Sequence, residues 1–382
     1  MTRASFIDEL RARTTGGGHS LLLAPIGAGK TFALSAIRAA LLRERTPHVF
    51  VDLFTSASTP EHLVASLVEG LRPHLRAHTA TLDSIAAEAA TDRHHSSGAL
   101  LRLFDLLSTK PATAPFVWLI DEVTEIRSLA YFPDLAEVEK PLANALNAAH
   151  GVIATSSYPA LATDLFPGLE ARDLPGLSAV DLETPATFQA ERGAIGDAIS
   201  LTRGFAATLL PLATEVHESR DAVCSLARLL APGAPLELIC RRHYEVMLLR
   251  SRGYAVSKRA AEVVAGAAGL RLTDLFPLIG RTPGASRQYL RWLVEVGLLT
   301  QIRKRYDFAD PVLGIWAALY LGRPEHPTSD EIRAAVDARL AKAREPIVLA
   351  AAETEVDDEP EAEVAEEPAP PKKRIDRFEE ID

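Results

Sequence analysis

The chain has 382 residues, of which 47% are apolar and 24% are charged, and this composition is typical of a globular protein long enough for two domains. No apolar run is long enough to cross a membrane, and the N-terminal residues lack a signal-peptide core, so we expect no membrane insertion. The two cysteines, Cys224 and Cys240, argue against a disulfide framework and favour a cytoplasmic location.

The net charge of −10 is unevenly distributed along the chain. Residues 353–382 hold 13 acidic and 4 basic residues, whereas residues 236–323 hold 14 basic and 7 acidic residues. The sequence therefore predicts an acidic body, a basic domain and an acidic tail, and this segregation bears on the choice of partners.

The first predicted strand, at residues 19–23, follows a short helix at 1–15 and leads into the sequence APIGAGKT at 24–31. A helix then extends to about Leu42. A strand, a glycine-bearing turn and Lys-Thr at the start of a helix form the layout of a phosphate-binding P-loop. Ala24 stands where this pattern begins with glycine, which a strand-like backbone tolerates.

The P-loop predicts how a nucleotide is held. Gly27 and Gly29 can adopt backbone angles that turn successive N–H groups toward an anion. Lys30 would reach the β- and γ-phosphates, and the Thr31 hydroxyl would bind Mg²⁺. The expected cofactors are ATP and Mg²⁺, and the expected nucleotide-binding residues are Ala24, Pro25, Ile26, Gly27, Ala28, Gly29, Lys30, Thr31, Phe32 and, further along the chain, Ser156.

The next segments separate the P-loop from a second motif. We expect a strand at 48–53, a helix at 60–78, a polar loop at 79–97 and a helix at 98–108. His94 and His95 lie in the polar stretch without a carboxylate or cysteine at ligand spacing, so we interpret them as surface residues rather than a metal site.

The second motif is an apolar strand that ends in two acids, FVWLIDE at residues 116–122. Ligands of open α/β sheets bind at the carboxyl ends of strands, where the P-loop also lies. Asp121 would hold Mg²⁺, and Glu122 would orient and polarise the attacking water. A solvated strand end is the alternative, but the P-loop about 90 residues earlier favours the catalytic interpretation.

A further strand at 151–155, after a helix at 130–149, ends in a run of hydroxyl residues. The motifs resemble those of P-loop ATPases with an acid pair after the third strand, in which a polar residue at the end of the next strand commonly contacts the γ-phosphate or the water. This resemblance makes Thr155 a candidate catalytic residue and Ser156 a candidate nucleotide ligand. Local turn capping by these hydroxyls is an equally open alternative.

A connector at 165–180 leads into a helical lid, with helices expected at 186–201, 205–217 and 220–230. Three arginines could reach a phosphate from the lid or from a neighbouring subunit, although each also fits an ordinary surface position: Arg127, Arg172 and Arg203.

The basic region has the order of a winged helix-turn-helix domain. Helices are expected at 236–252, 256–268, 272–279 and 285–296, followed by strands at 298–302 and 306–308. The candidate nucleic-acid contacts are Arg287 and Arg291 on the last helix and Arg303, Lys304 and Arg305 in the turn between the strands. A protein-interaction module with a basic face is the alternative.

Two more helices are expected, at 311–320 and at 329–344, with Ser329 as the N-cap of the second. Residues 353–382 are rich in acids, alanine and proline and are predicted to be disordered. They end in a basic and apolar stretch at 372–382, which we interpret as a docking motif for a protein partner.

The motifs at 24–31, 117–122 and 154–159, together with YLRWLVEVGLL…YDFADPVLGIW at 289–316, resemble the archaeal-type ATPases of the AAA+/STAND group. The resemblance covers most of residues 1–320. It implies a five-stranded parallel sheet with helices on both faces, a helical lid, a winged-helix module, Mg²⁺-dependent ATP hydrolysis that is slow, and nucleotide-dependent switching. The chain departs from that group after Gly204, where Phe205-Ala206 replace a Gly/Pro-containing signature, and no arginine finger is assigned.

We therefore predict an α/β P-loop fold. Its parts are an ATPase core at 1–180, a helical lid at 181–235, a winged-helix domain at 236–323, a helix within 324–352 and the tail at 353–382. The predicted function is an ATPase switch that moves the winged domain on double-stranded DNA or a partner. The alternatives are a nucleotide-regulated adaptor that binds no nucleic acid, and a DNA-loading ATPase that forms rings or filaments as a nucleotide-dependent homo-oligomer.

Overall fold

A computed structural model describes residues 2–109, 115–182, 192–266 and 269–344. The predicted acidic tail at 353–382 and its terminal motif lie outside the described residues, as do the first residues of the helix expected at 186–201. In the parts of the chain that the structure describes, none of the helices combines the length and apolarity needed to cross a bilayer.

The N-terminal region is built on a five-stranded sheet, as a P-loop α/β fold requires. All of its strands run parallel, in the order β2-β3-β4-β1-β5. The strands are β1 (His19–Leu23), β2 (His48–Asp52), β3 (Val117–Asp121), β4 (Gly151–Ser156) and β5 (Glu170–Asp173).

The parallel register brings the ends of separate strands to one edge of the sheet. Asp52 pairs with Asp121, while Leu23 pairs with both Ser156 and Asp173. The P-loop and the acid pair therefore leave the sheet at the same edge, where ligands of open α/β sheets bind.

The pattern of residues predicted a connector at 165–180 and did not predict strand β5. Its sequence, Glu-Ala-Arg-Asp, lies mostly exposed at the edge of the sheet and has no apolar run. Pairing with β1, rather than burial of apolar side chains, gives this segment its extended form.

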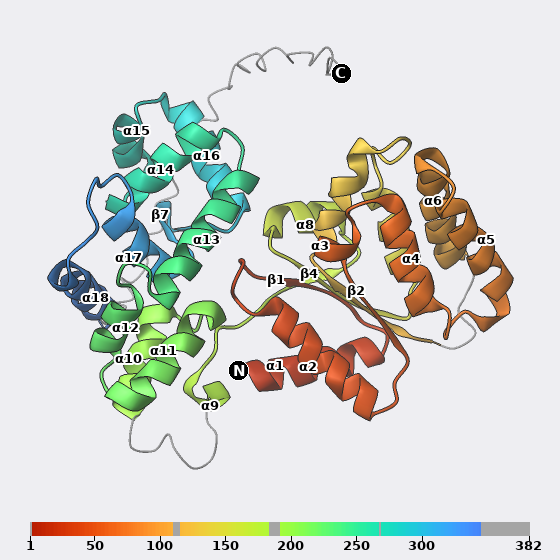
Figure 1. The fold of residues 1–382 in the computed structure, drawn as a ribbon, viewed down its shortest axis with the longest axis horizontal. Helices are drawn as coiled ribbons and strands as arrows, with labels where there is room; N and C mark the ends of the chain where they lie inside the picture. The colour runs from red at the N-terminus through yellow and green to blue at the C-terminus, as the bar shows by residue number, and fades with distance from the viewer. Residues whose placement is uncertain (1, 110–114, 183–191, 267–268, 345–382) are drawn as a thin grey trace, which may run out of the picture. The chain divides into compact units, whose positions relative to one another are not determined.

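Alternating side chains of the strands face two different hydrophobic clusters. Leu22 faces the helices α1 (Arg3–Thr15) and α2 (Lys30–Arg43), whereas Leu21 and Leu23 face the opposite layer. Figure 1 shows these helices on one face of the sheet and α4, α5 and α6 on the other. The second layer comprises α4 (Pro60–Leu71), α5 (Thr79–Ala89), α6 (Arg93–Thr109) and α7 (Glu139–Asn147).

Two predictions for this second layer were wrong. The polar loop expected at 79–97 contains α5, whose Leu82, Ile85 and Ala89 recur at helical spacing and are buried. His94 and His95 belong to the first turn of α6, where their backbone N–H groups donate to Asp92. They are exposed, as expected, but helical.

The helix predicted at 130–149 is interrupted. A 3₁₀ helix, η2 (Val123–Tyr131), precedes α7, and Phe132 between them is extended. Pro133 follows Phe132 and disfavours helical backbone at the residue before it. Three short elements complete this region: α3 (Leu53–Ser56), η1 (Arg76–His78) and α8 (Pro159–Leu165).

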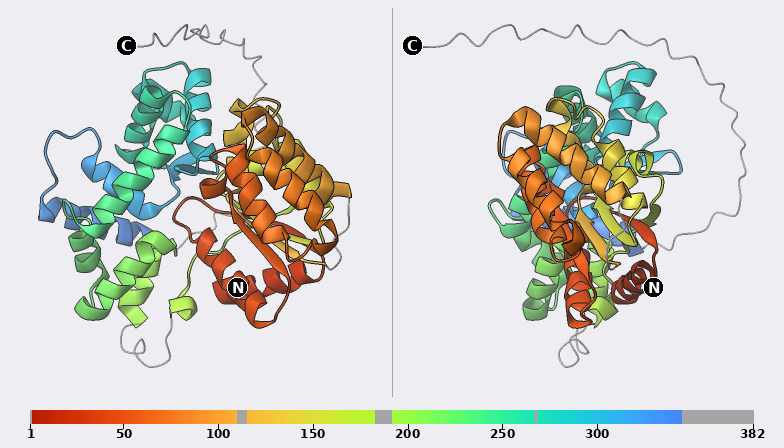
Figure 2. Two further views of the ribbon diagram at one scale, coloured as in Figure 1. Left: turned by 45° about the vertical axis from the view of Figure 1, so that its right-hand side comes forward. Right: turned by 90° about the vertical axis from the view of Figure 1, so that its right-hand side faces the viewer.

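The C-terminal region is mostly helical (Figure 2). Its elements surround their own hydrophobic cluster. That cluster is continuous from Ile195 to Leu340, so the predicted lid, winged domain and last helix share it. The first helices of the region are α9 (Ala179–Leu182), α10 (Arg192–Thr202), α11 (Ala206–Ser219), α12 (Ala222–Leu229) and α13 (Pro235–Arg250).

The helices and hairpin expected in the basic region are present in the predicted order. They are α14 (Tyr254–Gly266), α15 (Leu272–Ile279), α16 (Pro283–Glu295), β6 (Leu299–Ile302) and β7 (Arg305–Phe308), with the two strands antiparallel. Two helices follow, α17 (Pro311–Tyr320) and α18 (Ser329–Arg344).

The N-cap prediction for the last helix was one residue late. The Thr328 hydroxyl accepts from the Glu331 N–H, and the Glu331 carboxylate accepts from the Thr328 N–H at 2.8 Å. This reciprocal pair is a capping box, so Thr328 caps the helix and Ser329 is its first residue.

Candidate functional site

The turn between β1 and α2 has the strained backbone that its glycines permit. Gly27 has φ +84° and Gly29 has φ +100°, angles that other residues adopt at a cost. A side chain at Gly27 would also bring its first carbon within 2.7 Å of the His243 ring. Ala24 continues the strand pairing, since its N–H donates to the Ser156 carbonyl, so the missing first glycine imposes no strain.

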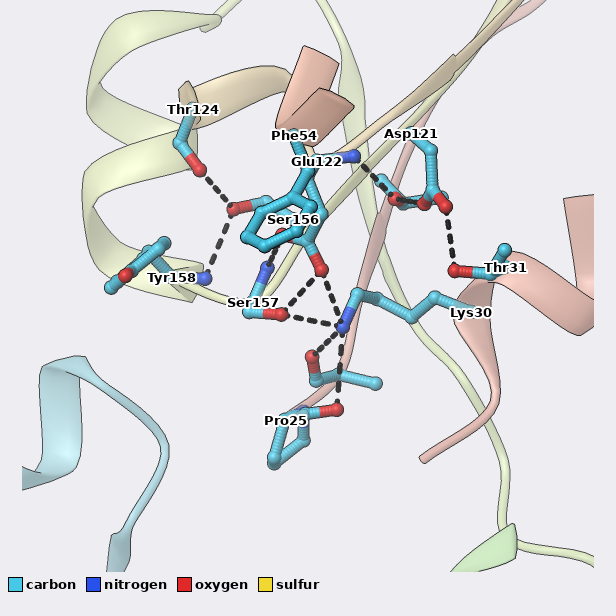
Figure 3. Close-up of polar contacts among 12 residues, drawn as sticks. Pro25, Lys30, Thr31, Phe54, Asp121, Glu122, Thr124, Ser156, Ser157 and Tyr158 are labelled. Atoms are coloured by element: carbon cyan, nitrogen blue, oxygen red, sulfur yellow. Dashed lines mark hydrogen bonds and ion pairs between the residues drawn. The ribbon is translucent and has the colours of Figure 1, made fainter. Parts of the chain in front are cut away.

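Lys30 lies folded against the turn and is almost fully buried (Figure 3). Its Nζ donates to the Ala24 carbonyl at 2.8 Å and to the Ser157 hydroxyl at 2.7 Å, and it lies 3.1 Å from Glu122 Oε1. Glu122 therefore balances the charge of Lys30, and a bound anion would compete with Glu122 for it.

Asp121 is 3% exposed and accepts hydrogen bonds from two threonines. Thr31 Oγ1 donates to Oδ2 at 2.6 Å, and Thr155 Oγ1 donates to Oδ1. Burial raises the pKa of Asp121 above its ordinary value, and these two hydroxyl groups partly offset that rise.

The Thr31 hydroxyl and the Asp121 carboxylate form a hard-oxygen donor pair that fits Mg²⁺. The structure contains no cluster of three or more His, Cys, Asp and Glu suited to a metal among its described residues. Magnesium in nucleotide sites is commonly held by one or two carboxylates together with phosphates and waters, so this small donor set is sufficient for it.

Glu122 has φ +50°, which is uncommon for a residue with a side chain. Its N–H donates to Thr155 Oγ1 at 3.0 Å, and its carboxylate accepts from the N–H and the hydroxyl of Ser157. The Thr155 hydroxyl thus joins the backbone of Glu122 to the carboxylate of Asp121, and it holds the acid pair in place.

The contacts of the hydroxyl residues at the end of β4 differ from the prediction. Ser156 Oγ bonds with Thr124 Oγ1 and accepts from the Tyr158 N–H, whereas Ser157 contacts both Lys30 and Glu122. The expected nucleotide ligand Ser156 is fully buried. Ser157 was missed because neighbouring hydroxyls in a strand-to-helix turn carry no sequence signal that distinguishes them.

A pocket of about 230 Å³ adjoins the P-loop. Its lining includes Arg3, Ala24 and Asp173, together with Arg203 and Phe205 from the turn before α11. The Arg3 guanidinium is buried and donates to the carbonyls of Ala28 and Pro175. Arg3 was not identified from the sequence, because its partners lie far from it along the chain.

The C-terminal helices contact the P-loop directly. The Ala207 N–H donates to the Gly27 carbonyl at 2.9 Å, and His243 of α13 lies against the same glycine. Burial lowers the pKa of His243, and Arg242 lowers it further, so the imidazole is neutral at pH 7. The P-loop is therefore in contact with both α11 and α13.

Of the three arginines considered as phosphate contacts, Arg203 lines the pocket beside the P-loop. Arg172 is bonded to Glu9 and lies over the Phe6 ring, and Arg127 is exposed on η2. The Arg203 guanidinium lies 3.9 Å from Asp307 of the hairpin.

Phe32 was also expected among the nucleotide-binding residues, and its side chain is 68% exposed.

The predicted nucleic-acid contacts are all exposed. Arg291 pairs with Glu295 of the same helix at 3.0 Å, and Arg305 donates to the Gly269 carbonyl at 2.7 Å. Arg303 and Lys304 form the two-residue hairpin turn with φ of 51° and 60°, and Arg287 lies on α16.

The fold is similar to that of a known Walker-type ATPase. The structure of the Walker-type ATPase PABY2304 of Pyrococcus abyssi superposes with a TM-score of 0.56 and 16% sequence identity, over 82% of this chain and 95% of that one. The branch migration motor RuvB of Thermotoga maritima has a TM-score of 0.35 and 14% identity, over 80% of this chain and 90% of that one. No protein-family model matches the sequence, and no curated protein matches it significantly. This chain thus shares the fold of a Walker-type ATPase.

Proposed function

We propose that the protein is a Mg²⁺-dependent ATPase whose nucleotide state controls its C-terminal region. The observation that carries this proposal is the convergence of Lys30, Thr31, Asp121 and Glu122 at one edge of the parallel sheet. A lysine, a hydroxyl, a metal-binding carboxylate and a second carboxylate are the groups that phosphoryl transfer to water requires.

Each of these residues has a separate role in the proposed reaction. Phosphate oxygens replace the loop carbonyls and Glu122 as partners of Lys30, which leaves the Glu122 carboxylate able to accept a proton from water. The water oxygen attacks the γ-phosphorus, the bond to the β–γ bridging oxygen breaks, and Glu122 takes the proton. Thr31 and Asp121 would hold Mg²⁺, which when bound neutralises charge on the phosphates.

The pocket beside the P-loop is the proposed place of the nucleotide base. It lies between the end of β1, the start of α1 and the turn before α11, and its lining combines apolar residues with the charged Arg3, Asp173 and Arg203. Because α11 and α13 also touch Gly27, a nucleotide that occupies this pocket would alter contacts of the C-terminal helices.

The test of the ATPase proposal is steady-state ATP turnover with Mg²⁺. Lys30→Ala should lower turnover at least about 100-fold by removing the phosphate contact, and Glu122→Gln should lower it about 100-fold or more while ATP still binds. Unchanged turnover in both variants would remove the basis for these roles.

The proposed output is a winged helix-turn-helix formed by α14 to β7 that contacts DNA. The excess of seven positive charges in residues 236–323 and the exposed arginines of α16 and the hairpin support it. Labelled duplex DNA should bind in a salt-dependent manner, with an affinity that differs between no nucleotide, ADP and a non-hydrolysable ATP analogue.

A second candidate is a nucleotide-regulated adaptor that binds protein instead of DNA. Ile302, beside the basic turn, is 60% exposed, and an apolar side chain at the tip of a hairpin suits a protein surface better than a phosphate backbone. Absence of DNA binding in every nucleotide state, at low and moderate salt, would favour the adaptor.

A further inference from the structure

Arg250, at the end of α13, contacts three connecting segments of the N-terminal region, which are α3, η2 and the turn before α8 and are called loops below. Its guanidinium lies 3.1 Å from the Glu125 carboxylate and lies over the rings of Phe54 and Tyr158, at 5.6 Å and 5.5 Å from their centroids. Arg250 and Glu125 are each 21% exposed. A pair shielded to this degree, with two aromatic contacts, is stronger than an open surface pair.

The three partners of Arg250 follow three neighbouring strands of the sheet. Phe54 follows β2, Glu125 follows β3 and Tyr158 follows β4. Because these strands are adjacent and parallel, the loops that follow them leave the sheet at the same edge as Glu122. Arg250 therefore contacts the segments that follow all three of the strands β2, β3 and β4.

Two of these loops also contact Glu122, one at its backbone carbonyl and one at its carboxylate. Glu125 lies one 3₁₀ turn after Glu122, and its N–H donates to the Glu122 carbonyl at 2.9 Å. Tyr158 directly follows Ser157, whose N–H and hydroxyl donate to Glu122. By contacting both Glu125 and Tyr158, Arg250 stabilises the loops on both sides of the Glu122–Ser157 contact.

The Glu122–Ser157 contact occupies both oxygens of the carboxylate. Oε1 accepts from the Ser157 hydroxyl and lies near Lys30, and Oε2 accepts from the Ser157 N–H. A carboxylate with all its strong partners in the protein is a poor acceptor for a proton of water. The arrangement that Arg250 stabilises is thus a resting one.

We propose that Arg250 is a positioning residue that restrains ATP hydrolysis by holding the loops around Glu122 in this resting arrangement, and that movement of α13 releases them. The inference rests on the proposed ATPase function and assigns one residue to its regulation. It predicts that loss of Arg250 raises turnover, whereas an arginine that contacted the phosphates would lower it when removed.

The experiment compares Arg250→Gln with the full-length wild-type protein. The maximal turnover with ATP should rise about fivefold, and the KM for ATP should change less than about twofold, because the residue acts on Glu122 and not on the nucleotide. Glu125→Gln should reproduce the rise, and the two changes together should add little to either alone. Arg252→Gln is the matched control, because Arg252 lies over Trp292 within the C-terminal region and should leave turnover unchanged.

A second measurement does not depend on hydrolysis. Without nucleotide, the backbone N–H groups of Ser157 and Tyr158 should exchange with deuterium about fivefold faster in Arg250→Gln than in wild type. Arg250→Lys keeps the charge but loses the planar guanidinium, so its exchange rates should lie between those of wild type and Arg250→Gln. This variant replaces Arg250→Gln if the glutamine variant does not fold.

Two results would overturn the inference: a fall in turnover on removal of Arg250, or unchanged exchange at Ser157 and Tyr158. A different pair of results would show that the proposed ATPase function is wrong. In that case the wild-type protein and Arg250→Gln would both lack ATP turnover that depends on Lys30, while faster exchange in the variant would still establish Arg250 as a restraint on these loops.

Discussion

The charged side chains at the P-loop edge of the sheet differ in burial and bonding from those on the basic surface of α16 and the hairpin. At the P-loop edge the charged and polar side chains are buried and bonded to one another: Lys30 is 5% exposed and Asp121 3%. On the basic surface the arginines are exposed; Arg291 pairs with Glu295, and Arg305 donates to the Gly269 carbonyl.

The difference agrees with the functions proposed for the two surfaces. A buried charge is tolerable only with fixed partners, so a catalytic site must position its groups before the substrate arrives. A surface that attracts a polyanion acts through the number of its charges, and no single one of them needs a fixed position. Single substitutions should therefore have large effects at the P-loop edge and small, additive ones on the basic surface.

The largest effect should come from Asp121→Asn. An amide oxygen lacks the negative charge that holds Mg²⁺, so ATP turnover should fall about 1000-fold, with a weaker dependence on Mg²⁺ concentration. Turnover measured across a Mg²⁺ titration checks this. Asp164→Asn, at an exposed position of α8, is the control, and a loss of less than about tenfold in Asp121→Asn would contradict the metal-binding role.

The next effect concerns a buried acid at the base of the hairpin. Asp310 caps α17 by accepting from the Val312 N–H, and burial raises its pKa to about 7. In the unfolded chain an aspartate titrates near about 3.9. Between these values the folded protein holds a proton that the unfolded chain has released. The free energy of unfolding should therefore fall as pH rises from about 4 to about 7, by up to about 1.4 kcal/mol per unit, and level off above.

Asp310→Asn should remove this contribution, since asparagine does not ionise and its carbonyl can still cap the helix. Urea unfolding at several pH values measures the slope. Asp330→Asn, at an exposed position in the first turn of α18, should keep the wild-type slope. If Asp310→Asn also kept it, Asp310 would not be protonated in the folded protein.

A smaller effect should follow from Arg287→Gln combined with Arg291→Gln. If the basic surface binds DNA, the affinity should fall about tenfold, and the dependence of log K on log salt should become shallower by about two. Binding at several salt concentrations measures both quantities. Arg228→Gln with Arg333→Gln, which removes two exposed arginines of α12 and α18, is the matched control; equal losses in both pairs would argue against a specific surface.

The smallest effect is expected at the hairpin turn. Arg303 and Lys304 both have positive φ, which Asn-Gly adopts at lower cost. Arg303→Asn with Lys304→Gly should raise the free energy of unfolding by about 1 kcal/mol, measured by denaturant unfolding. Replacing both residues by alanine removes the same charges without relieving the backbone and should give no gain, so a gain in the alanine pair would point to charge repulsion instead.

The sequence by itself determined the P-loop, the acid pair and the order of the C-terminal helices and hairpin. These features depend on local patterns. Gly27 and Gly29 are required by backbone angles that the turn must adopt, and an apolar run that ends in Asp121 and Glu122 identifies a buried strand and its carboxyl end. Such patterns lie within a few residues of each other and can be recognised without the fold.

The tertiary structure alone decided which residues complete the site. Strand β5 has no apolar run and depends on pairing with β1; Arg3, Ser157 and Arg250 reach partners that lie far away in the chain. A polar contact between distant segments leaves no periodic trace in the sequence, because any arginine or serine is compatible with solvent. Only the packing of the sheet and helices determines which of them is buried beside Lys30 and Glu122.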